Sequence, residues 1–407
     1  MTDSNPPIHA HPLPRLTKQA VQSALRPRLW PEPFTPERTR FYFRGSNALW
    51  HALKALRLEA GSQVLFPAYH CGIELDVLSA AGMGISFYGV GRGLTLDART
   101  IEQQVGPETR ALYVIHYYGI PQDLTEILAL CRRHRLALIE DCAMALYSRR
   151  EGRPVGGDGD VAVFSLWKSV AMPFGGALVV NNPDLQLPEP GQPPSGYEVL
   201  RATKQLLEME FRGTGWFEGV RKCLEPLARA ARGVSAKTSH DSWRKQPLWV
   251  PLFAVERGEW GMTAVSRHLF LTADHEAIRM ARRRNYLTMD SFVRTLSCVA
   301  PLLSDLPAGA CPLYYPVTVE DPVAFRRFLR ARGLETFMMW RELHPLFPAE
   351  KFSEEASLRA HVVALPVHQH LDSPAWSVTR EALTAWDRGR ESHTLGSPQT
   401  VTAEQCV

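Results

Sequence analysis

The sequence predicts an α/β protein in which a mainly parallel sheet is covered by helices and is followed by a smaller α+β domain. Between about residues 44 and 182, short β-rich apolar runs alternate with amphipathic stretches, which is typical of such a sheet. The chain has 407 residues. It therefore exceeds the roughly 250 to 300 residues that one hydrophobic core serves, so two domains are expected. Hydrophobic residues make up 45% and charged residues 22%, which favours a soluble globular class.

The first half of the chain carries the expected strands at residues 64–68, 85–90, 111–116, 137–140, 161–165 and 177–180. Helices are expected between them at residues 47–56, 73–81 and 124–134, where apolar residues recur every third or fourth position. Because parallel crossovers are right-handed, the carboxyl ends of the strands share one edge of the sheet, where open α/β sheets form their sites. His116, Asp141 and Ser165 fall at such ends.

The second half predicts a different architecture. Residues 183–195 are rich in proline and predict a surface loop. Helices are expected at 197–211, 217–232 and 263–292, and strands at 313–319 and 362–367 flank a helix at 322–332. We therefore expect an N-terminal arm at 1–40, a large domain at 41–255 with a helical insertion after about 183, a smaller C-terminal domain at 256–388, and a loose tail at 389–407.

Charge, cysteine content and hydropathy argue against several classes of protein. The net charge of +4 is mild, and the basic run at 282–284 predicts a solvated helix face rather than a nucleic-acid surface. Seven cysteines without metal-binding spacing indicate a reducing cytosol, so a cytoplasmic location is expected. The N-terminus lacks the apolar core of a signal peptide, and no segment has the length of a membrane span, so neither export nor membrane insertion is expected.

Lys168 and Asp141 predict the chemistry. Lys168 follows the strand at 161–165 and precedes Gly175 and Gly176, and Asp141 closes the strand at 137–140. A pyridoxal phosphate site needs an amine that holds the aldehyde as a Schiff base and a carboxylate that keeps the pyridine ring cationic. A lysine between apolar strands is by itself more often a surface residue. The acidic strand end that precedes Lys168 in the sequence favours a cofactor site over a surface position.

A phosphate site is predicted at the start of the first helix. The cofactor's phosphate needs backbone N–H donors and a hydroxyl group at a helix N-terminus. Gly45 supplies a turn, Ser46 is expected as the N-cap, and Ser46 and Asn47 are the candidate phosphate ligands. An ordinary serine-capped helix is the alternative, and position at the start of the α/β region favours the phosphate site.

These stretches resemble the DegT/DnrJ/StrS sugar aminotransferases, fold-type I pyridoxal phosphate enzymes of the aspartate aminotransferase superfamily. The resemblance covers roughly residues 44 to 182. It rests on Gly-Ser-Asn-Ala-Leu at 45–49, Pro-Ala-Tyr-His at 67–70, Ile-His-Tyr-Tyr-Gly-Ile-Pro at 115–121, Glu-Asp-Cys-Ala-Met at 140–144 and Phe-Ser-Leu-Trp-Lys at 164–168. Residues 282–286 and 365–368 are weaker matches. It implies an aspartate-aminotransferase-like fold type I, with a large α/β domain and a smaller α+β domain.

The resemblance also implies residue roles. Lys168 would be the Schiff-base lysine, Asp141 would contact the pyridine nitrogen, and Ser46, Asn47 and Ser165 would surround the phosphate. Two departures mark a divergent member. Met144 stands near the cofactor where relatives commonly have Gln or His, so a hydrogen-bond donor is lost. The spacing from Ser165 to Lys168 is shorter than usual.

The remaining candidates are aromatic residues and histidines. Tyr69 or His70 is expected to stack on the cofactor ring, with His70 preferred. His116 is either a substrate contact or a strand-end histidine that is satisfied structurally, and His368 is a further substrate candidate. His368 and His370 share a side of a strand without a third ligand, so no metal is predicted.

The predicted function is transfer of an amino group from an amino acid donor, glutamate, to a keto group of a sugar nucleotide or similar biosynthetic intermediate. A pyridoxal phosphate enzyme that eliminates, decarboxylates or substitutes acyl groups, and a non-catalytic cofactor-binding protein, are the alternatives. The resemblance implies a homodimer with shared active sites. Ser266 and Arg267 are the guesses for partner-facing residues.

Overall fold

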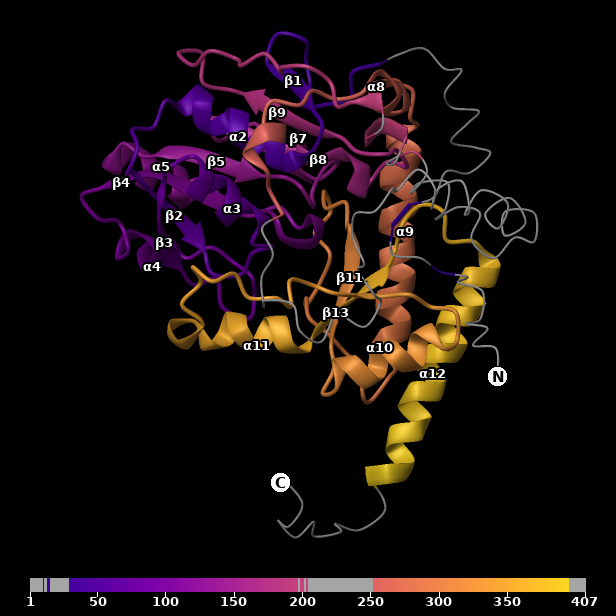
Figure 1. Ribbon diagram of the computed structural model, residues 1–407. Helices are drawn as coiled ribbons and strands as arrows, with labels where there is room; N and C mark the ends of the chain where they lie inside the picture. Colours follow the sequence, from indigo (N-terminus) through magenta and orange to yellow (C-terminus); the bar gives the residue numbers. More distant parts are fainter. Residues whose placement is uncertain are drawn as a thin grey trace, which may run out of the picture.

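Two sheets organise the molecule. The computed structural model describes residues 10, 13–14, 29–196, 198–200, 203 and 252–394. The first sheet, drawn from indigo to magenta, has seven strands, and the second, in orange, has four (Figure 1). No helix among the described residues combines the length and the apolar character that crossing a membrane requires.

The large sheet is mainly parallel, as predicted. Its strands in spatial order are β1 (Thr39–Tyr42), β9 (Gly176–Val180), β8 (Val161–Ser165), β5 (Ala137–Asp141), β4 (Thr109–Ile115), β2 (Gln63–Pro67) and β3 (Gly84–Tyr88). The run from β8 to β3 is parallel, whereas β9 pairs antiparallel with both β8 and β1. All the strands predicted between residues 64 and 180 are confirmed within two residues at each end.

The predicted helices of this half are also confirmed. They are α2 (Gly45–Leu56), α3 (Ile73–Ala80) and α5 (Thr125–His134), with the short α4 (Ala98–Glu102) in addition. Ser46 as N-cap was wrong. Arg44 occupies the N-cap position in an extended conformation, and no side chain caps the helix. The helix begins two residues earlier than predicted, at Gly45, where a Cβ atom would lie 3.3 Å from the carbonyl oxygen of Phe164.

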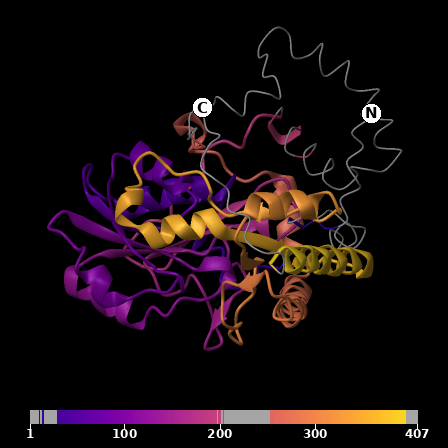
Figure 2. The same ribbon diagram turned by 90° about the horizontal axis from the view of Figure 1, so that it is seen from below.

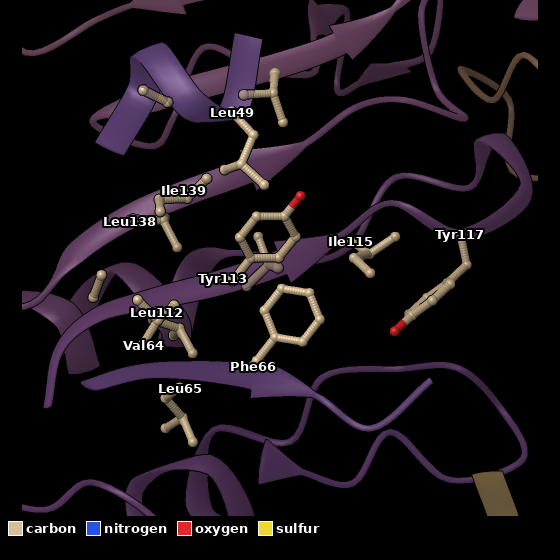
Figure 3. Close-up of a cluster of buried hydrophobic side chains, with 14 of the residues drawn as sticks. Leu49, Val64, Leu65, Phe66, Leu112, Tyr113, Ile115, Tyr117, Leu138 and Ile139 are labelled. Atoms are coloured by element: carbon tan, nitrogen blue, oxygen red, sulfur yellow. The ribbon is translucent and has the colours of Figure 1, made fainter. Parts of the chain in front are cut away.

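The core of the large sheet is aromatic as well as aliphatic (Figure 3). Phe66 on β2 and Tyr113 on β4 lie with ring centroids 4.5 Å apart, and both are almost fully buried. Strands β4, β5 and β8 are buried along nearly their whole length, which fits central strands covered on both faces. Tyr113 is a core residue whose hydroxyl group extends to the end of the neighbouring strand β5.

The second sheet is antiparallel, in the order β10 (Ala300–Pro301), β11 (Tyr314–Thr318), β13 (Val362–Pro366) and β12 (Phe337–Met338). Its helices are α9 (His275–Val293), α10 (Pro322–Arg330), α11 (Ser353–His361) and α12 (Ser373–Thr394). Helix α12, in yellow, lies beside this sheet (Figure 2). The predicted strands near 313–319 and 362–367 and the helix near 322 are confirmed. The smaller elements are β6 (Arg149–Arg150), β7 (Arg153–Pro154), η1 (Tyr117–Gly119), η2 (Leu166–Lys168), η4 (Val255–Arg257) and η5 (Ala349–Lys351).

Three expectations need correction or fall outside the described residues. The single helix expected at 263–292 is two helices, α8 (Ala264–Leu271) and α9, because the Asp274 carboxylate caps a new helix by accepting from Ala277 N (3.1 Å). The tail expected to be loose from residue 389 remains helical to Thr394. The helices predicted at 197–211 and 217–232 lie almost entirely outside the described residues.

The two sheets meet where η1 contacts the chain entering β11. A Cβ atom at Gly119 (φ +92°) would collide with the backbone of Cys311, so only glycine fits. Leu313 N donates to Tyr118 O (3.0 Å), and Ser148 Oγ donates to Gly119 O (2.6 Å) while accepting from Cys311 N (2.9 Å). Backbone contacts therefore join the two parts at this point.

Candidate functional site

Asp141 ends β5 with its side chain buried at the edge of the sheet. Its Oδ2 accepts from the Tyr113 hydroxyl (2.8 Å) and its Oδ1 from Ala143 N (2.7 Å), and 4% of the residue is exposed. Burial raises the pKa of Asp141, while the positive charge of Lys168 opposes that rise. The carboxyl group is thus held rigidly, with a cation nearby.

Lys168 closes η2, directly after β8. Its ammonium group acts on Asp141, Glu74 and Cys71, where it opposes the rise in pKa that burial causes. Its carbonyl oxygen accepts from Arg282 Nη2 (3.2 Å). The structure therefore brings together the lysine and the aspartate that the sequence predicted as a pair.

A narrow cradle lies where α2 begins. A Cβ atom at Gly45 would lie 3.4 Å from Ser165 Cβ, and one at Gly176 would collide with the carbonyl group of Arg44. The first turn of α2, the end of β8 and the start of β9 are consequently packed against each other without intervening side chains. Ser165 and the first turn of α2 are therefore neighbours, as a phosphate site at a helix N-terminus requires.

The two predicted phosphate ligands differ in their surroundings. Ser46 is half-buried in the first turn of α2. Asn47 is buried, and its Nδ2 donates to Arg257 O (2.6 Å) and Gly258 O (3.0 Å). The amide nitrogen of Asn47 is therefore used to hold a distant loop, which leaves Ser46 and Ser165 as the hydroxyl groups of the cradle.

The rings expected to stack on the cofactor are used elsewhere. His70 has 0% exposure and lies among Phe66, Phe87 and Phe347, with centroid distances of 5.4, 5.9 and 5.5 Å. Tyr69 is equally buried, and its hydroxyl group lies 2.9 Å from that of Tyr118. The structure thus corrects the preference for His70, because a ring enclosed by phenylalanines has no free face.

Cys71 and Glu74, which the sequence reasoning missed, lie at the end of this loop and in the first turn of α3, where the charges of Lys168 and Asp141 act on them. Gly72 turns the chain between them at φ 98°, and its N–H donates to Glu74 Oε2 (3.0 Å). Burial and the charge of Asp141 raise the pKa of Glu74 to about 7, and burial raises the pKa of Cys71 to about 12. Their place after the carboxyl end of β2 was the available signal.

His116 belongs to a buried structural pair. Its Nε2 lies 3.1 Å from Glu140 Oε2, and its Nδ1 accepts from Gln122 N (2.9 Å). With Cys142, these residues bring possible ligand atoms within 4.8 Å of one another, but the histidine and carboxylate atoms already have hydrogen-bond partners. The geometry favours the alternative of a structurally satisfied strand-end histidine over a substrate contact.

The other candidates are scattered. Met144 is 3% exposed and packs in the core of the large sheet beside the Asp141 turn. His368 is 2% exposed, and its Nδ1 accepts from His370 N (3.1 Å). Ser266 is buried within the first turn of α8, whereas Arg267 is exposed and lies over the Phe41 ring (5.9 Å). None of these contacts connects them with Lys168.

Known proteins match this part of the chain. Residues 43–188 match the model of the DegT/DnrJ/EryC1/StrS aminotransferase family. An L-glutamine:scyllo-inosose aminotransferase of Streptomyces griseus is 35% identical over 46% of this chain. A UDP-N-acetyl-3-dehydro-alpha-D-glucosamine 3-aminotransferase of Acidithiobacillus ferrooxidans is 33% identical over 35% of this chain. The match spans less than half of these curated relatives, 45% and 40% of their lengths.

The fold extends the likeness beyond this segment. The crystal structure of the aminotransferase TlmJ from Streptoalloteichus hindustanus superposes with a TM-score of 0.64 at 20% identity, covering 94% of this chain and 98% of that one. The chain has the expected aspartate-aminotransferase-like fold type I. Over residues 43–188 it is similar to the DegT/DnrJ/EryC1/StrS aminotransferase family.

Proposed function

We propose that the chain is a pyridoxal phosphate-dependent aminotransferase that moves an amino group from glutamate to a keto group of a sugar nucleotide or a similar small intermediate. The observation that carries the proposal is the buried Asp141 carboxyl group, which Tyr113 and Ala143 fix at the end of β5 near Lys168. A carboxylate held by two donors is suited to bind a pyridinium N–H.

The residues present fit the cofactor. Asp141 would hold the ring nitrogen, Lys168 would hold the aldehyde, and Ser46, Ser165 and the first N–H groups of α2 would hold the phosphate. The cradle at Gly45 and Gly176 supports this assignment, because a Cβ atom at Gly176 would collide with Arg44 at the helix start. When bound, the cofactor supplies an electron sink for the carbon that loses its proton.

The chain's own residues supply proton movement and orientation. Lys168 Nζ would be the base that takes the α-proton of the donor and delivers it to the carbon on the other side of the transferred nitrogen. Asp141 keeps a proton on the ring nitrogen through a charge-assisted hydrogen bond worth about 1.5–3 kcal/mol. Tyr113 and Ala143 fix the carboxylate that would accept this bond.

The relatives support the substrate class. The names of both curated relatives above describe amino transfer to a cyclic keto compound, one an inosose and one a nucleotide-linked sugar. One of those names gives glutamine as its donor, so glutamine belongs beside glutamate in any donor test. Because the matched segment spans less than half of each relative, the acceptor assignment for this chain rests on analogy.

A second candidate is another pyridoxal phosphate reaction at the same lysine, such as elimination, decarboxylation or acyl substitution. Cys71 and Glu74 favour it, because they add a thiol and a titratable carboxyl group beside Lys168. Met144 favours it as well, since its thioether is at most a weak hydrogen-bond acceptor. A non-catalytic cofactor-binding protein is the third candidate.

We also propose a cytoplasmic homodimer. Exposed apolar side chains on α8 and α9 support the dimer, with Val265, Met280 and Leu287 exposed by 51, 59 and 47%. A mass measurement by light scattering on the purified protein tests it. A monomer at micromolar concentration would contradict it.

The central experiment is an absorbance spectrum of the protein with added pyridoxal phosphate, before and after L-glutamate or L-glutamine. The wild type is compared with Lys168→Ala and with Lys54→Ala, a half-exposed lysine paired with Glu259. We expect the Schiff-base band to be absent only in Lys168→Ala, and the amino acid to convert the wild-type band to that of the amine form.

Each outcome separates the candidates. A band that forms but does not respond to either amino acid supports the second candidate. A protein that binds the cofactor, turns over no amine and tolerates Lys168→Ala is the non-catalytic one. The absence of a band in the wild type contradicts the cofactor itself.

A further inference from the structure

Two arginines, one on α9 and one on α11, are buried beside the site and hydrogen-bonded to backbone carbonyl groups. Arg282 on α9 is 1% exposed and Arg359 on α11 is 2% exposed. Among the residues that the structure describes, neither guanidinium group has a carboxylate oxygen within 4.0 Å, the distance limit for an ion pair. Burying a cation in this way is costly unless strong hydrogen bonds replace its water.

Arg282 holds the loop of the lysine. Its Nη2 donates to Lys168 O (3.2 Å) and more weakly to Ser169 O (3.5 Å), and its Nη1 donates to Leu313 O (3.1 Å). Gln369, which follows β13, donates through Nε2 to the same Ser169 oxygen (3.0 Å). Groups from α9 and from the end of β13 therefore converge on the backbone that carries Lys168.

Arg359 holds the loop on the other side of the site. Its Nη2 donates to Ala68 O (3.0 Å), and its Nη1 donates to His70 O (2.8 Å) and Trp340 O (2.8 Å). The guanidinium carbon also lies 5.0 Å from the centre of the Phe347 ring. The loop that it fixes continues directly into Cys71.

Both arginines thus perform the same physical task. The carbonyl groups at 68, 70, 168 and 169 lie outside the sheet ladder, and buried carbonyl groups need donors. A guanidinium group offers five N–H donors in a rigid plane, so it can satisfy several carbonyl groups at once. The lysine ammonium group has three donors and lacks this planar arrangement, so it does this less well. Each arginine reaches from the half of the chain that builds the second sheet.

We propose that Arg282 and Arg359 are positioning residues on two sides of the site: Arg282 fixes the loop of Lys168, and Arg359 fixes the loop that leads through Cys71 to Glu74 on α3. Through them the second sheet sets the separation of these loops. The effect of this positioning on catalysis rests on the proposed function, whereas the positioning of the loops can be measured without the cofactor.

The test is a crossed labelling experiment on the cofactor-free protein. Iodoacetamide reports on Cys71 and reductive methylation reports on Lys168, and both sites are quantified by peptide mass spectrometry against Cys298 and Lys54. We expect Arg359→Gln to change the Cys71 rate by about tenfold and the Lys168 rate by less than about twofold. Arg282→Gln is expected to do the reverse.

Matched controls separate positioning from general loosening. Arg283 on the same helix donates to Pro307 O and Ala310 O, so Arg283→Gln removes carbonyl bonds away from both loops and is expected to change neither rate. If both glutamine variants change both rates alike, or change neither, the proposal is overturned. If a glutamine variant does not fold, Arg282→Lys and Arg359→Lys keep the cation, lose the planar fork, and are expected to give the same crossed pattern in weaker form.

A spectral readout links the test to the site. We expect Arg282→Gln to weaken formation of the Schiff-base band with added pyridoxal phosphate by at least about tenfold in apparent Kd, and Arg283→Gln to leave it unchanged. An unchanged Kd in Arg282→Gln would overturn its role toward Lys168. Failure of the wild type to form the band contradicts the proposed function instead, while the crossed labelling result stands on its own.

Discussion

Glu140 and Asp141 are neighbours on β5, yet their carboxyl groups lie on opposite faces of the strand in opposite surroundings. Glu140 accepts from the N–H groups of Gly156 (3.0 Å) and Asp158 (2.8 Å) and pairs with His116. Although burial opposes it, these bonds lower the pKa of Glu140. Burial instead raises the pKa of Asp141, which has fewer donors.

The comparison distinguishes a structural acid from a functional one. On the Glu140 face the chain itself satisfies the carboxylate, so the hydrogen-bonded pair of Glu140 and His116 is closed to any ligand. On the Asp141 face two donors and the nearby Lys168 leave the carboxyl group with capacity to accept from a further cationic partner. Sequence order alone does not reveal which of two adjacent acids has this spare capacity.

Removing the structural acid gives the largest expected effect. Glu140→Ala leaves His116 and several buried N–H groups without their acceptor, so we expect the free energy of unfolding to fall by about 3–5 kcal/mol. Urea denaturation followed by circular dichroism measures it. Glu102→Ala, which removes an exposed pair with Arg133, is the control and should cost no more than about 1 kcal/mol. If Glu140→Ala lowers the free energy of unfolding no more than the control does, Glu140 does not have the structural role assigned to it.

Removing the functional acid should affect turnover instead. Asp141→Asn is expected to slow amino transfer at least about tenfold, because a neutral amide does not hold the ring proton by a charge-assisted bond. Its free energy of unfolding should stay within about 1 kcal/mol of the wild type. Tyr113→Phe, which removes one donor to the same carboxylate, should give a smaller loss of turnover. Undiminished turnover in Asp141→Asn contradicts the assignment.

A third test measures how stability depends on pH through Glu74, whose pKa the nearby Asp141 charge helps to raise. The folded protein holds the Glu74 proton up to about pH 7, whereas the unfolded chain releases it near the ordinary value of 4.5. The folded state therefore binds more protons across this window, so the free energy of unfolding falls as the pH rises through it. Glu74→Gln removes that fall, and its stability relative to wild type should be higher at pH 8 than at pH 4.5 by at least about 1 kcal/mol.

The measurement is urea denaturation at the two pH values. Glu276→Gln, an exposed acid paired with Arg279, serves as the control, since its pKa is lowered rather than raised. A stability difference between Glu74→Gln and wild type that is equal at both pH values would refute the assignment of a raised pKa to Glu74.

The smallest expected effect is at Met144. Met144→Leu replaces one buried apolar side chain by another of similar volume, so turnover should stay within about twofold and stability within about 1.5 kcal/mol. Steady-state kinetics and thermal unfolding check this. A large loss of turnover with unchanged stability would mean that the sulfur atom contacts the reacting groups.

The fold and one half of the site followed from the sequence. Long apolar runs and turn residues place β4, β5 and β8, and parallel topology then places Asp141 and Ser165 at one edge. The other half depends on distant contacts. The loop after β2 turns at Gly72, whose φ is positive, and is held by Arg359, almost three hundred positions away in the chain.

Local patterns were misleading where backbone groups replace charged partners. The basic run at 282–284 suggests a solvated face, but Arg282 is buried because carbonyl groups of two other segments satisfy it. His116 looked equally suited to a ligand and to the core, because the sequence gives no sign that Glu140 points to the same side. Pairings between strands decide such cases, and they are not local.

The close approach at Gly119 has a mechanical consequence. Since the backbones of η1 and of the chain before β11 touch without room for a methyl group, any residue other than glycine at position 119 would force the two sheets apart at this joint. Leu313, whose carbonyl oxygen accepts from Arg282, lies two residues after Cys311 at this joint. Arg359 instead binds the loop after β2 from helix α11. A larger residue at position 119 would therefore disturb first the contacts that Arg282 makes with Leu313 O and Lys168 O.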